Sequence, residues 1–233
     1  MKILYEDKYL LLCEKPVGEN SQFSTDEGSK NLPEKLMAYR AGKGEDSYIG
    51  LVHRLDVVTG GVMLYSKNRN LTGKLSELVA QKEYKKTYLA VVTSRPEVDS
   101  GEMTDLLFHD KQRNKTYVVD RERRGVKPAS LKYRTLESVN LPSGEQISLV
   151  EIELLTGRTH QIRVQFSSRK MPLIGDGKYG SKHNCSCALW SYRAEFIHPQ
   201  TQKSVCVSSI PPAVYPWTEF EYFKSRQEFS KTE

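Results

Sequence analysis

His53-Arg54-Leu55-Asp56-Val57-Val58-Thr59-Gly60-Gly61 is the stretch from which the rest of the chain is best interpreted. Asp56 follows a short apolar run, Ile49–Val52, and precedes two glycines, so we expect it on a loop at the end of a strand. Glycines permit positive φ and close backbone approach, which suits a loop that lies against a ligand. An aspartate placed there can cap a turn, act as a general base or act as a nucleophile. The stretch alone leaves all three roles open.

About a hundred residues later, Gly157-Arg158-Thr159-His160-Gln161-Ile162-Arg163 brings two arginines and a histidine close together in the sequence. The pattern predicts a helix over 158–168, on which His160 and Arg163 share a face at i and i+3. From such a rigid element Arg163 can hold a carboxylate through two hydrogen bonds and favour its ionised form. The alternatives are a structural ion pair for Arg163 and a backbone hydrogen bond for His160.

The composition indicates a basic protein of ordinary hydrophobicity. Its 233 residues include 35 Lys and Arg against 29 Asp and Glu, a formal net charge of +6. A positive balance favours polyanionic partners such as nucleic acid, because neutralised phosphates release counterions, although many basic proteins bind none. No apolar stretch approaches the length needed to cross a bilayer, and the acids within the first eight residues argue against a signal peptide. We therefore expect no membrane partner and a cytoplasmic location.

The cysteines raise the question of a metal site. His183, Cys185 and Cys187, with Cys206 as a fourth ligand, could bind a metal. The His-x-Cys-x-Cys spacing, however, lacks the two-residue gap of common zinc knuckles. Reduced thiols in or beside strands are the favoured interpretation, and we expect no metal.

The chain is rich in expected strands and poor in expected helices. Residues 101–127 look irregular and strongly charged, and 120–125 should form an exposed loop, either solvated or in contact with RNA. The segment 18–31 should be a loop, and 220–229 a terminal helix or loose tail. Hydrophobic periodicity predicts helices around 32–39 and 71–79 and strands at 3–5, 10–14, 85–93, 131–139, 147–154, 188–197 and 205–209. Without a βαβ rhythm or a break in composition, this order predicts one mixed α+β domain.

These motifs carry a family resemblance. The His53–Gly61 stretch resembles the active-site signature of the RluA-type pseudouridine synthases, and 157–164 resembles their second signature almost position for position. A histidine at position 53, rather than glycine, is similar to the RluA branch and not to the RsuA branch. Further matching stretches in the family's order are Lys15-Pro16-x-Gly18, Lys86-Thr87-Tyr88-Leu89-Ala90-Val91-Val92, Pro172-Leu173-Ile174-Gly175-Asp176-Gly177-Lys178-Tyr179-Gly180 and Phe196-Ile197-His198-Pro199.

The resemblance implies a fold and a reaction. The fold is an α+β pseudouridine synthase-like domain with a central mixed, mainly antiparallel sheet flanked by helices and loops. It would span residues 1–233, with a core of about 10–210 and a C-terminal extension at 211–233. The reaction isomerises uridine in RNA to pseudouridine: uracil is detached from its sugar, turned and rejoined through carbon 5, without cofactor or metal.

The resemblance also implies roles for particular residues. Asp56 is the catalytic carboxylate, acting on the ribose as nucleophile or base. Tyr88 stacks on the uracil and serves in proton removal from carbon 5, and Arg163 pairs with the catalytic carboxylate. Arg54 enters the RNA stack where the target base is flipped out, since a stacked base is out of an enzyme's reach. The other residues grouped with RNA binding and base flipping are His53, Thr59, Arg158 and His160.

The chain departs from the family pattern in places. It has Gly60 where the family usually has serine, Gln165 where histidine often follows the second signature, and an unusual segment at 19–22. The Lys-Pro motif begins at residue 15, so we expect a bare catalytic domain without the S4 domain that precedes it in many relatives. We expect a monomer acting on a tRNA or rRNA stem-loop.

Two alternatives belong to other classes of function. A catalytically inactive RNA-binding homologue or RNA chaperone would be favoured by loss of the carboxylate, which this chain retains. A metal-dependent hydrolase would need clustered His and acid ligands, whereas the five histidines are dispersed in the sequence.

Overall fold

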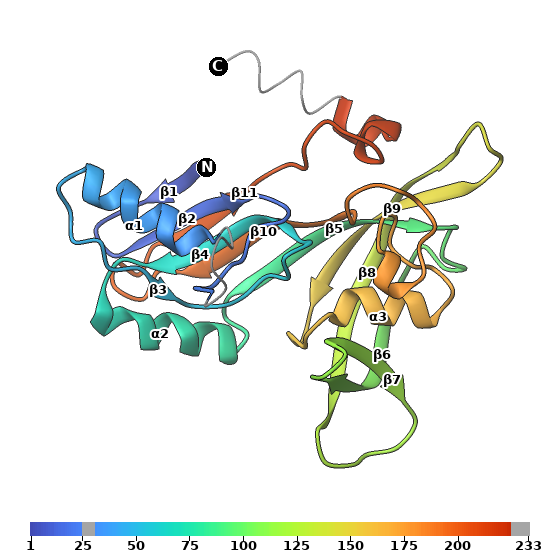
Figure 1. The fold of residues 1–233 in the computed structure, drawn as a ribbon, viewed down its shortest axis with the longest axis horizontal. Coiled ribbons are helices and arrows are strands. Elements are labelled where there is room, and N and C mark those ends of the chain that lie inside the picture. Colours follow the sequence, from blue (N-terminus) through green and yellow to red (C-terminus); the bar gives the residue numbers. More distant parts are fainter. Residues whose placement is uncertain (25–30, 225–233) are drawn as a thin grey trace. The chain divides into compact units, whose positions relative to one another are not determined.

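The computed structural model describes residues 1–24 and 31–224, which belong to two compact units (Figure 1). The first unit comprises Met1–Lys86 and Trp190–Ile210. The second comprises Thr87–Leu189 and the chain from Pro211 onward. The predicted loop at 18–31 and tail at 220–229 therefore lie partly outside the described residues.

The first unit is built on strands in the order β1-β2-β4-β10-β11, and β3 adds to β4. The β4–β10 pair is parallel, and the other pairs of the unit's named strands are antiparallel. The strands are β1 (Ile3–Glu6), β2 (Leu10–Lys15), β3 (Gly50–Leu51), β4 (Gly60–Ser66), β10 (Leu189–Ile197) and β11 (Ser204–Ser208).

Two helices, α1 (Leu32–Gly42) and α2 (Arg69–Ala80), lie on either side of these strands (Figure 1). Each starts at an asparagine whose side chain accepts a backbone N–H of the first turn, Asn31 from Glu34 and Asn68 from Asn70. The apolar face of α2 packs on the sheet in a cluster of side chains that alternate along the strands; its members include Leu10, Leu12, Val62, Leu64, Leu71, Leu75 and Phe196.

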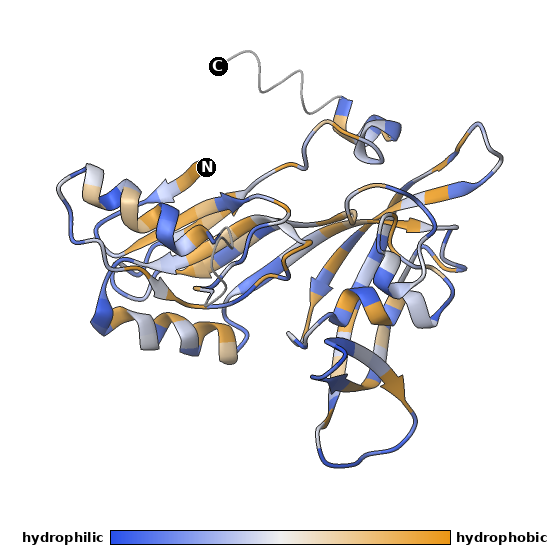
Figure 2. Ribbon diagram, viewed as in Figure 1, coloured by the Kyte–Doolittle hydropathy of each residue, from blue (hydrophilic) through white to orange (hydrophobic). Residues whose placement is uncertain are grey.

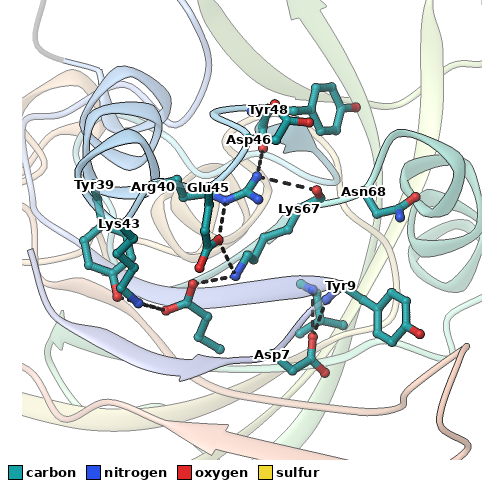
Figure 3. A network of polar contacts seen from close by, with 12 residues as sticks. Asp7, Tyr9, Tyr39, Arg40, Lys43, Glu45, Asp46, Tyr48, Lys67 and Asn68 are labelled. Carbon is teal, nitrogen blue, oxygen red and sulfur yellow. Dashed lines mark hydrogen bonds and ion pairs between the residues drawn. The ribbon is translucent and has the colours of Figure 1, made fainter.

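A network of charged side chains joins β1, α1 and the end of β4 (Figure 3). Glu6 accepts from Lys43 at 2.9 Å and from Lys67 at 2.6 Å, and Lys67 also lies 3.0 Å from Glu45. Arg40 donates to Glu45 at 3.1 Å and to the Tyr48 carbonyl. Burial raises the pKa of Glu6, but the hydrogen bonds from Lys67, Lys43 and Tyr39 outweigh it and lower that pKa to about 2.

The second unit is an antiparallel sheet in the order β5-β9-β8-β6-β7. Helix α3 (Gln161–Ser168) packs against β6 and β7, and two 3₁₀ turns follow, η1 (Gly177–Tyr179) and η2 (Trp217–Glu219). The strands are β5 (Lys85–Thr93), β6 (Ser100–Asp110), β7 (Lys115–Val119), β8 (Val126–Asn140) and β9 (Gln146–Leu154). Figure 2 shows polar residues along the loop that connects β7 to β8.

The fold class is confirmed as α+β with mixed, mainly antiparallel strands. The assignment of residues 1–233 to one domain, with a core at 10–210, stays a prediction. No helix in the described part of the chain is both long and apolar enough to cross a membrane.

Two expectations about local structure are wrong. Residues 101–127 are mostly strand, because β6 pairs with β7 on one edge and with β8 on the other; only the turn after β6 and the exposed loop at 120–125 are irregular. The predicted helix at 158–168 begins instead at Gln161. His160 precedes it in the left-handed region, with φ of 54°, so Arg158 and His160 are not on the helix.

Candidate active site

Asp56 lies in the first unit, on the loop that leads from β3 into β4. The backbone N–H of Thr59 donates to the Asp56 carbonyl at 3.0 Å and closes a tight turn. Asp56 is half-buried, while its neighbours Arg54 and Val57 are exposed. The expectation of a strand-end loop is confirmed for this carboxylate.

The two glycines after this turn have a packing role. A Cβ on Gly60 would collide with the indole of Trp190, and a Cβ on Gly61 would collide with the Ser191 backbone. Gly61 also has φ of +107°, which L side chains rarely adopt. The glycines therefore allow a close approach to β10, the parallel neighbour of β4, and their approach to a ligand stays a prediction.

Residues 15–21 brace the turn. The Lys15 ammonium donates to the carbonyls of Pro16 at 2.9 Å and Val57 at 3.2 Å, and the Gly18 N–H also donates to the Val57 carbonyl at 2.8 Å. The Ser21 hydroxyl donates to the Leu55 carbonyl at 2.9 Å and accepts from its N–H at 3.2 Å. The residues on both sides of Asp56 are thus held through their backbones.

Lys15 also sets the charge beside the turn. Its side chain is fully buried. Burial lowers the pKa of Lys15 to about 8, against the opposing attraction of the Glu19 and Asp56 carboxylates. A pKa of about 8 leaves most of the ammonium charged at neutral pH, so a positive charge lies beside the Asp56 turn.

His53 is part of the packing beneath the loop. Its ring is buried 5.2 Å from the ring of Tyr84, and its Nε2 accepts the Leu64 N–H at 3.3 Å. Burial, reinforced by the charge of Lys86, lowers the pKa of His53 well below its usual value, so the ring is neutral. These contacts give His53 a structural role, and its contact with RNA stays a prediction. Thr59 is likewise buried.

Tyr88 and Arg163 lie in the second unit. Tyr88 is buried at the middle of β5, opposite Ile152 of β9. The guanidinium of Arg163, on α3, forms a bidentate ion pair with Asp176: Nε to Oδ2 at 2.6 Å and Nη2 to Oδ1 at 2.8 Å. Both members of that pair are almost fully buried. Asp56 belongs to the first unit, so its pairing with Arg163 and its convergence with Tyr88 stay predictions.

Tyr179 organises the surroundings of Arg163. The guanidinium carbon of Arg163 lies 5.0 Å from the centre of the Tyr179 ring. The Tyr179 hydroxyl accepts the Thr116 N–H at 2.8 Å and lies 2.9 Å from His160 Nδ1. His160 is thus buried against Tyr179 and positioned by its own left-handed backbone. Arg158 is half-buried and donates to the Pro128 carbonyl at 3.0 Å.

Lys15, Ser21, Asp176 and Tyr179 are site residues to which the sequence analysis assigns no role. Lys15, Asp176 and Tyr179 do lie within the stretches that resemble the family. The sequence therefore marked these positions, but no contact or role could be inferred for them from the motif alone. Ser21 lies in the segment that departs from the family pattern, and only the folded structure reveals its contacts with Leu55.

The histidine considered as a metal ligand has other partners. His183 Nε2 lies 3.1 Å from Glu145 Oε1, and its Nδ1 lies 3.0 Å from the Tyr215 hydroxyl. None of the four cysteines, all within the described residues, forms a disulfide. Over residues 1–24 and 31–224, no group of three or more His, Cys, Asp or Glu side chains has the arrangement of a metal site.

Comparison with known proteins identifies the class. Residues 9–168 match the family model described as RNA pseudouridylate synthase. This match covers more than half of the chain, so the chain belongs to the RNA pseudouridylate synthase family, and its enzyme class is RNA pseudouridine synthase. The match confirms the family that the sequence motifs indicate.

Particular relatives agree with this. The chain is 31% identical over 216 residues to the uncharacterized RNA pseudouridine synthase YhcT of Bacillus subtilis, covering 91% of this chain and 69% of that protein. It is 30% identical to the ribosomal large subunit pseudouridine synthase C of Buchnera aphidicola, covering 89% of this chain and 66% of that protein. With synthase D of Neisseria meningitidis it shares 30% identity over 92% of this chain and 59% of that protein.

Solved structures support the fold. Human RNA Pseudouridylate Synthase Domain Containing 4 superimposes with a TM-score of 0.70 at 23% identity, covering 91% of this chain and 88% of that one. Human RNA Pseudouridylate Synthase Domain Containing 1 gives a TM-score of 0.74 at 21% identity, and the match covers 91% of this chain and 84% of that one. At such identities the likeness concerns the fold alone.

Proposed function

We propose that this protein converts uridine to pseudouridine in a tRNA or rRNA stem-loop, with Asp56 as the catalytic carboxylate. The bond from uracil N1 to ribose C1′ breaks and C5 bonds to C1′. A proton leaves C5 and N1 gains one, so the reaction is a balanced isomerisation that needs no cofactor. The observation that carries the proposal is the braced Asp56 turn within the family's signature.

The turn suits Asp56 for acting on the ribose. The half-buried Asp56 side chain lies near the positive charge of Lys15, and a carboxylate can serve the reaction as nucleophile or base. The hydrogen bonds to Leu55 and Val57 hold the backbone on both sides of Asp56 in place. The loop therefore loses little conformational entropy when the substrate binds.

Arg163 would bind Asp56 while Asp176 holds the guanidinium in place. The Asp176 pair uses two of the five guanidinium N–H donors. Pairing with Asp176 therefore does not by itself preclude pairing with a second carboxylate. In this proposal Asp176 and Tyr179 are positioning residues, because they act through Arg163.

Tyr88 would stack on the uracil, and Arg54 would take the place of the flipped nucleotide in the RNA. Arg54 is exposed, as that role requires, and it lies two residues before Asp56. Flipping brings the glycosidic bond within reach of the carboxylate, and a closed pocket limits hydrolysis of the detached sugar. We also propose RNA contacts from Arg158 and His160, a monomeric state and a cytoplasmic location.

Pseudouridine mapping by carbodiimide and primer extension tests the activity. RNA from cells lacking the gene should lose signal at defined uridines, and the wild-type gene should restore it. An unchanged map, together with no activity of the purified protein on unmodified total RNA, would favour the inactive RNA-binding homologue.

A further inference from the structure

Glu19 is a buried acid of the first unit to which the proposed chemistry assigns no role. Its Oε1 accepts a hydrogen bond from the Lys35 ammonium at 2.5 Å. Its Oε2 is also buried and has no hydrogen-bond partner within residues 1–24 and 31–224. A buried carboxylate with one free oxygen is unfavourable unless a cation lies nearby, so the site calls for a second positive charge.

The backbone on both sides of Glu19 is fixed. The Gly18 N–H donates to the Val57 carbonyl at 2.8 Å, within the turn of the proposed catalytic carboxylate. The Asn20 carbonyl accepts the Leu32 N–H at 2.9 Å, where α1 begins. The acid is therefore held between that turn and the first residue of the helix.

Lys15 is the second cation beside Glu19. Its ammonium is fully buried and uses two of its three N–H donors on the carbonyls of Pro16 and Val57. Burial lowers the pKa of Lys15 to about 8, and the attraction of the Glu19 and Asp56 carboxylates opposes this. The charge on Lys15 in this buried position therefore depends on Glu19.

The other titratable groups near Glu19 keep their charge state around pH 8. Burial raises the pKa of Tyr65 and of Cys13 far above their ordinary values, so both are neutral. Lys35 is exposed on α1, and solvent weakens its effect on the buried groups. A change of charge near pH 8 at this place is thus that of Lys15.

We propose that Glu19 is a positioning residue for pseudouridine formation, which acts through Lys15 to hold the Val57 carbonyl and with it the Asp56 turn. The charged ammonium offers three donors and forms stronger hydrogen bonds than the neutral amine, so it holds the turn more firmly. Glu19 belongs to the segment at 19–22 that departs from the family pattern. This inference rests on the proposed function, because the turn matters through Asp56.

The test compares three single variants. Glu19→Gln removes the charge and keeps the shape, and Glu19→Asp keeps the charge on a shorter side chain. Glu34→Gln is the matched control, because Glu34 is exposed in the first turn of α1 and forms no ion pair with a described residue.

Two quantities are measured between pH 6 and 9. One is the single-turnover rate of pseudouridine formation at saturating concentrations of an RNA identified by mapping. The other is the titration midpoint of Lys15, from nuclear magnetic resonance of the lysine side-chain nitrogens, with the signal assigned by its loss in Lys15→Met. RNA affinity and thermal unfolding are measured alongside.

The Lys15 midpoint should fall by about one pH unit in Glu19→Gln, because an attracting charge is lost. From a midpoint of about 8, such a fall leaves about 5-fold less charged Lys15 at pH 8 but almost the same amount at pH 6. The rate should follow this difference, with RNA affinity near that of wild type. Glu19→Asp should lie between wild type and Glu19→Gln, and the control should match wild type.

An unchanged Lys15 midpoint in Glu19→Gln would overturn the inference. A rate deficit of equal size at every pH would also overturn it, since a purely structural role predicts that result. Should Glu19→Gln not fold, Glu19→Asp carries the test, because its displaced charge should lower the midpoint in part.

The two proposals fail separately. If the wild type forms pseudouridine and Glu19→Gln has the Lys15 midpoint of wild type, the Glu19 inference is wrong and the proposed function stands. If the wild type never forms pseudouridine but Glu19→Gln lowers the Lys15 midpoint relative to the control, the proposed function is wrong. The coupling between Glu19 and Lys15 then stands without it.

Discussion

The buried ion pair between Arg163 and Asp176 is the best-defined interaction of the candidate site. Its two short hydrogen bonds and its burial fix the guanidinium in one orientation. Removing one charge from such a pair leaves the other charge buried without a partner. The resulting loss in free energy of unfolding is larger than the net stabilisation that the intact pair provides.

Asp176→Asn should therefore lower the free energy of unfolding by about 3–5 kcal/mol and reduce pseudouridine formation more than RNA affinity. Urea denaturation measures the first effect. Glu151→Gln is the control, because its partner Arg134 is 64% exposed, and its cost should stay below about 1 kcal/mol. Equal stabilities of the two variants would refute the structural part, and a loss confined to RNA affinity would refute the positioning role.

At this scale the sequence predicted that Arg163 holds a carboxylate but did not point to Asp176, and the pairing with Asp56 stays a prediction. Arg163 was predicted to hold a carboxylate, and it does, but the observed partner lies 13 residues away, beyond the end of α3 and a turn at Gly175. Spacing along a helix cannot reveal a contact made after the chain turns back. The left-handed backbone of His160 was equally hidden, since histidine adopts it only where tertiary contacts compensate.

At the scale of elements, β4 and β10 can pair only because β4 begins with two glycines. Gly61→Ala should reduce the free energy of unfolding by at least about 2 kcal/mol, because the Cβ meets the Ser191 backbone in a left-handed conformation. Gly73→Ala is the matched control, since Gly73 lies within α2 with nothing within 4 Å, and it should stabilise by about 0.5–1 kcal/mol. Thermal unfolding of both variants checks this, and similar melting temperatures would contradict it.

The charged network around Glu6 should make the first unit sensitive to acid. The pKa of Glu6 is lowered to about 2 from an ordinary value of 4.5. Its charge therefore contributes fully to the free energy of unfolding above about pH 4.5, and this contribution is lost as pH falls toward 2. Wild type should exceed Glu6→Gln in unfolding free energy at pH 7, and this difference should shrink toward pH 2. Glu77→Gln, an exposed change on α2, controls for the loss of one charge. A difference that is constant with pH would show that Glu6 does not stabilise through its charge.

Elements with clear alternation or helical periodicity were predicted well, and β5 was predicted with the bounds that it has. β6 was missed because the acids Glu102, Asp105 and Asp110 interrupt it, and its buried residues Met103 and Leu107 are too widely spaced to show a period of two. β7 was missed because it is only five residues long and buries just one of them, Thr116. Backbone pairing of β6 with β8 on one edge and with β7 on the other makes both segments strands, although their side-chain patterns do not indicate it.

For the whole molecule, the sequence supported three conclusions that the structure and comparisons confirm: an α+β fold, a mainly antiparallel arrangement and membership of the RNA pseudouridylate synthase family. Motifs far apart in the sequence made the family recognisable, because their order and spacing are improbable by chance. The division into two compact units was not predicted, since no change of composition marks it.

The central claim is that Asp56 performs the chemistry. The most direct measurement is pseudouridine formed by purified wild type and Asp56→Asn in one turnover on an RNA identified by mapping, quantified after nuclease digestion, with RNA affinity measured in parallel. We predict that Asp56→Asn binds the RNA within a few-fold of wild type and forms no detectable pseudouridine. Pseudouridine formation by Asp56→Asn at a rate close to wild type would contradict the account.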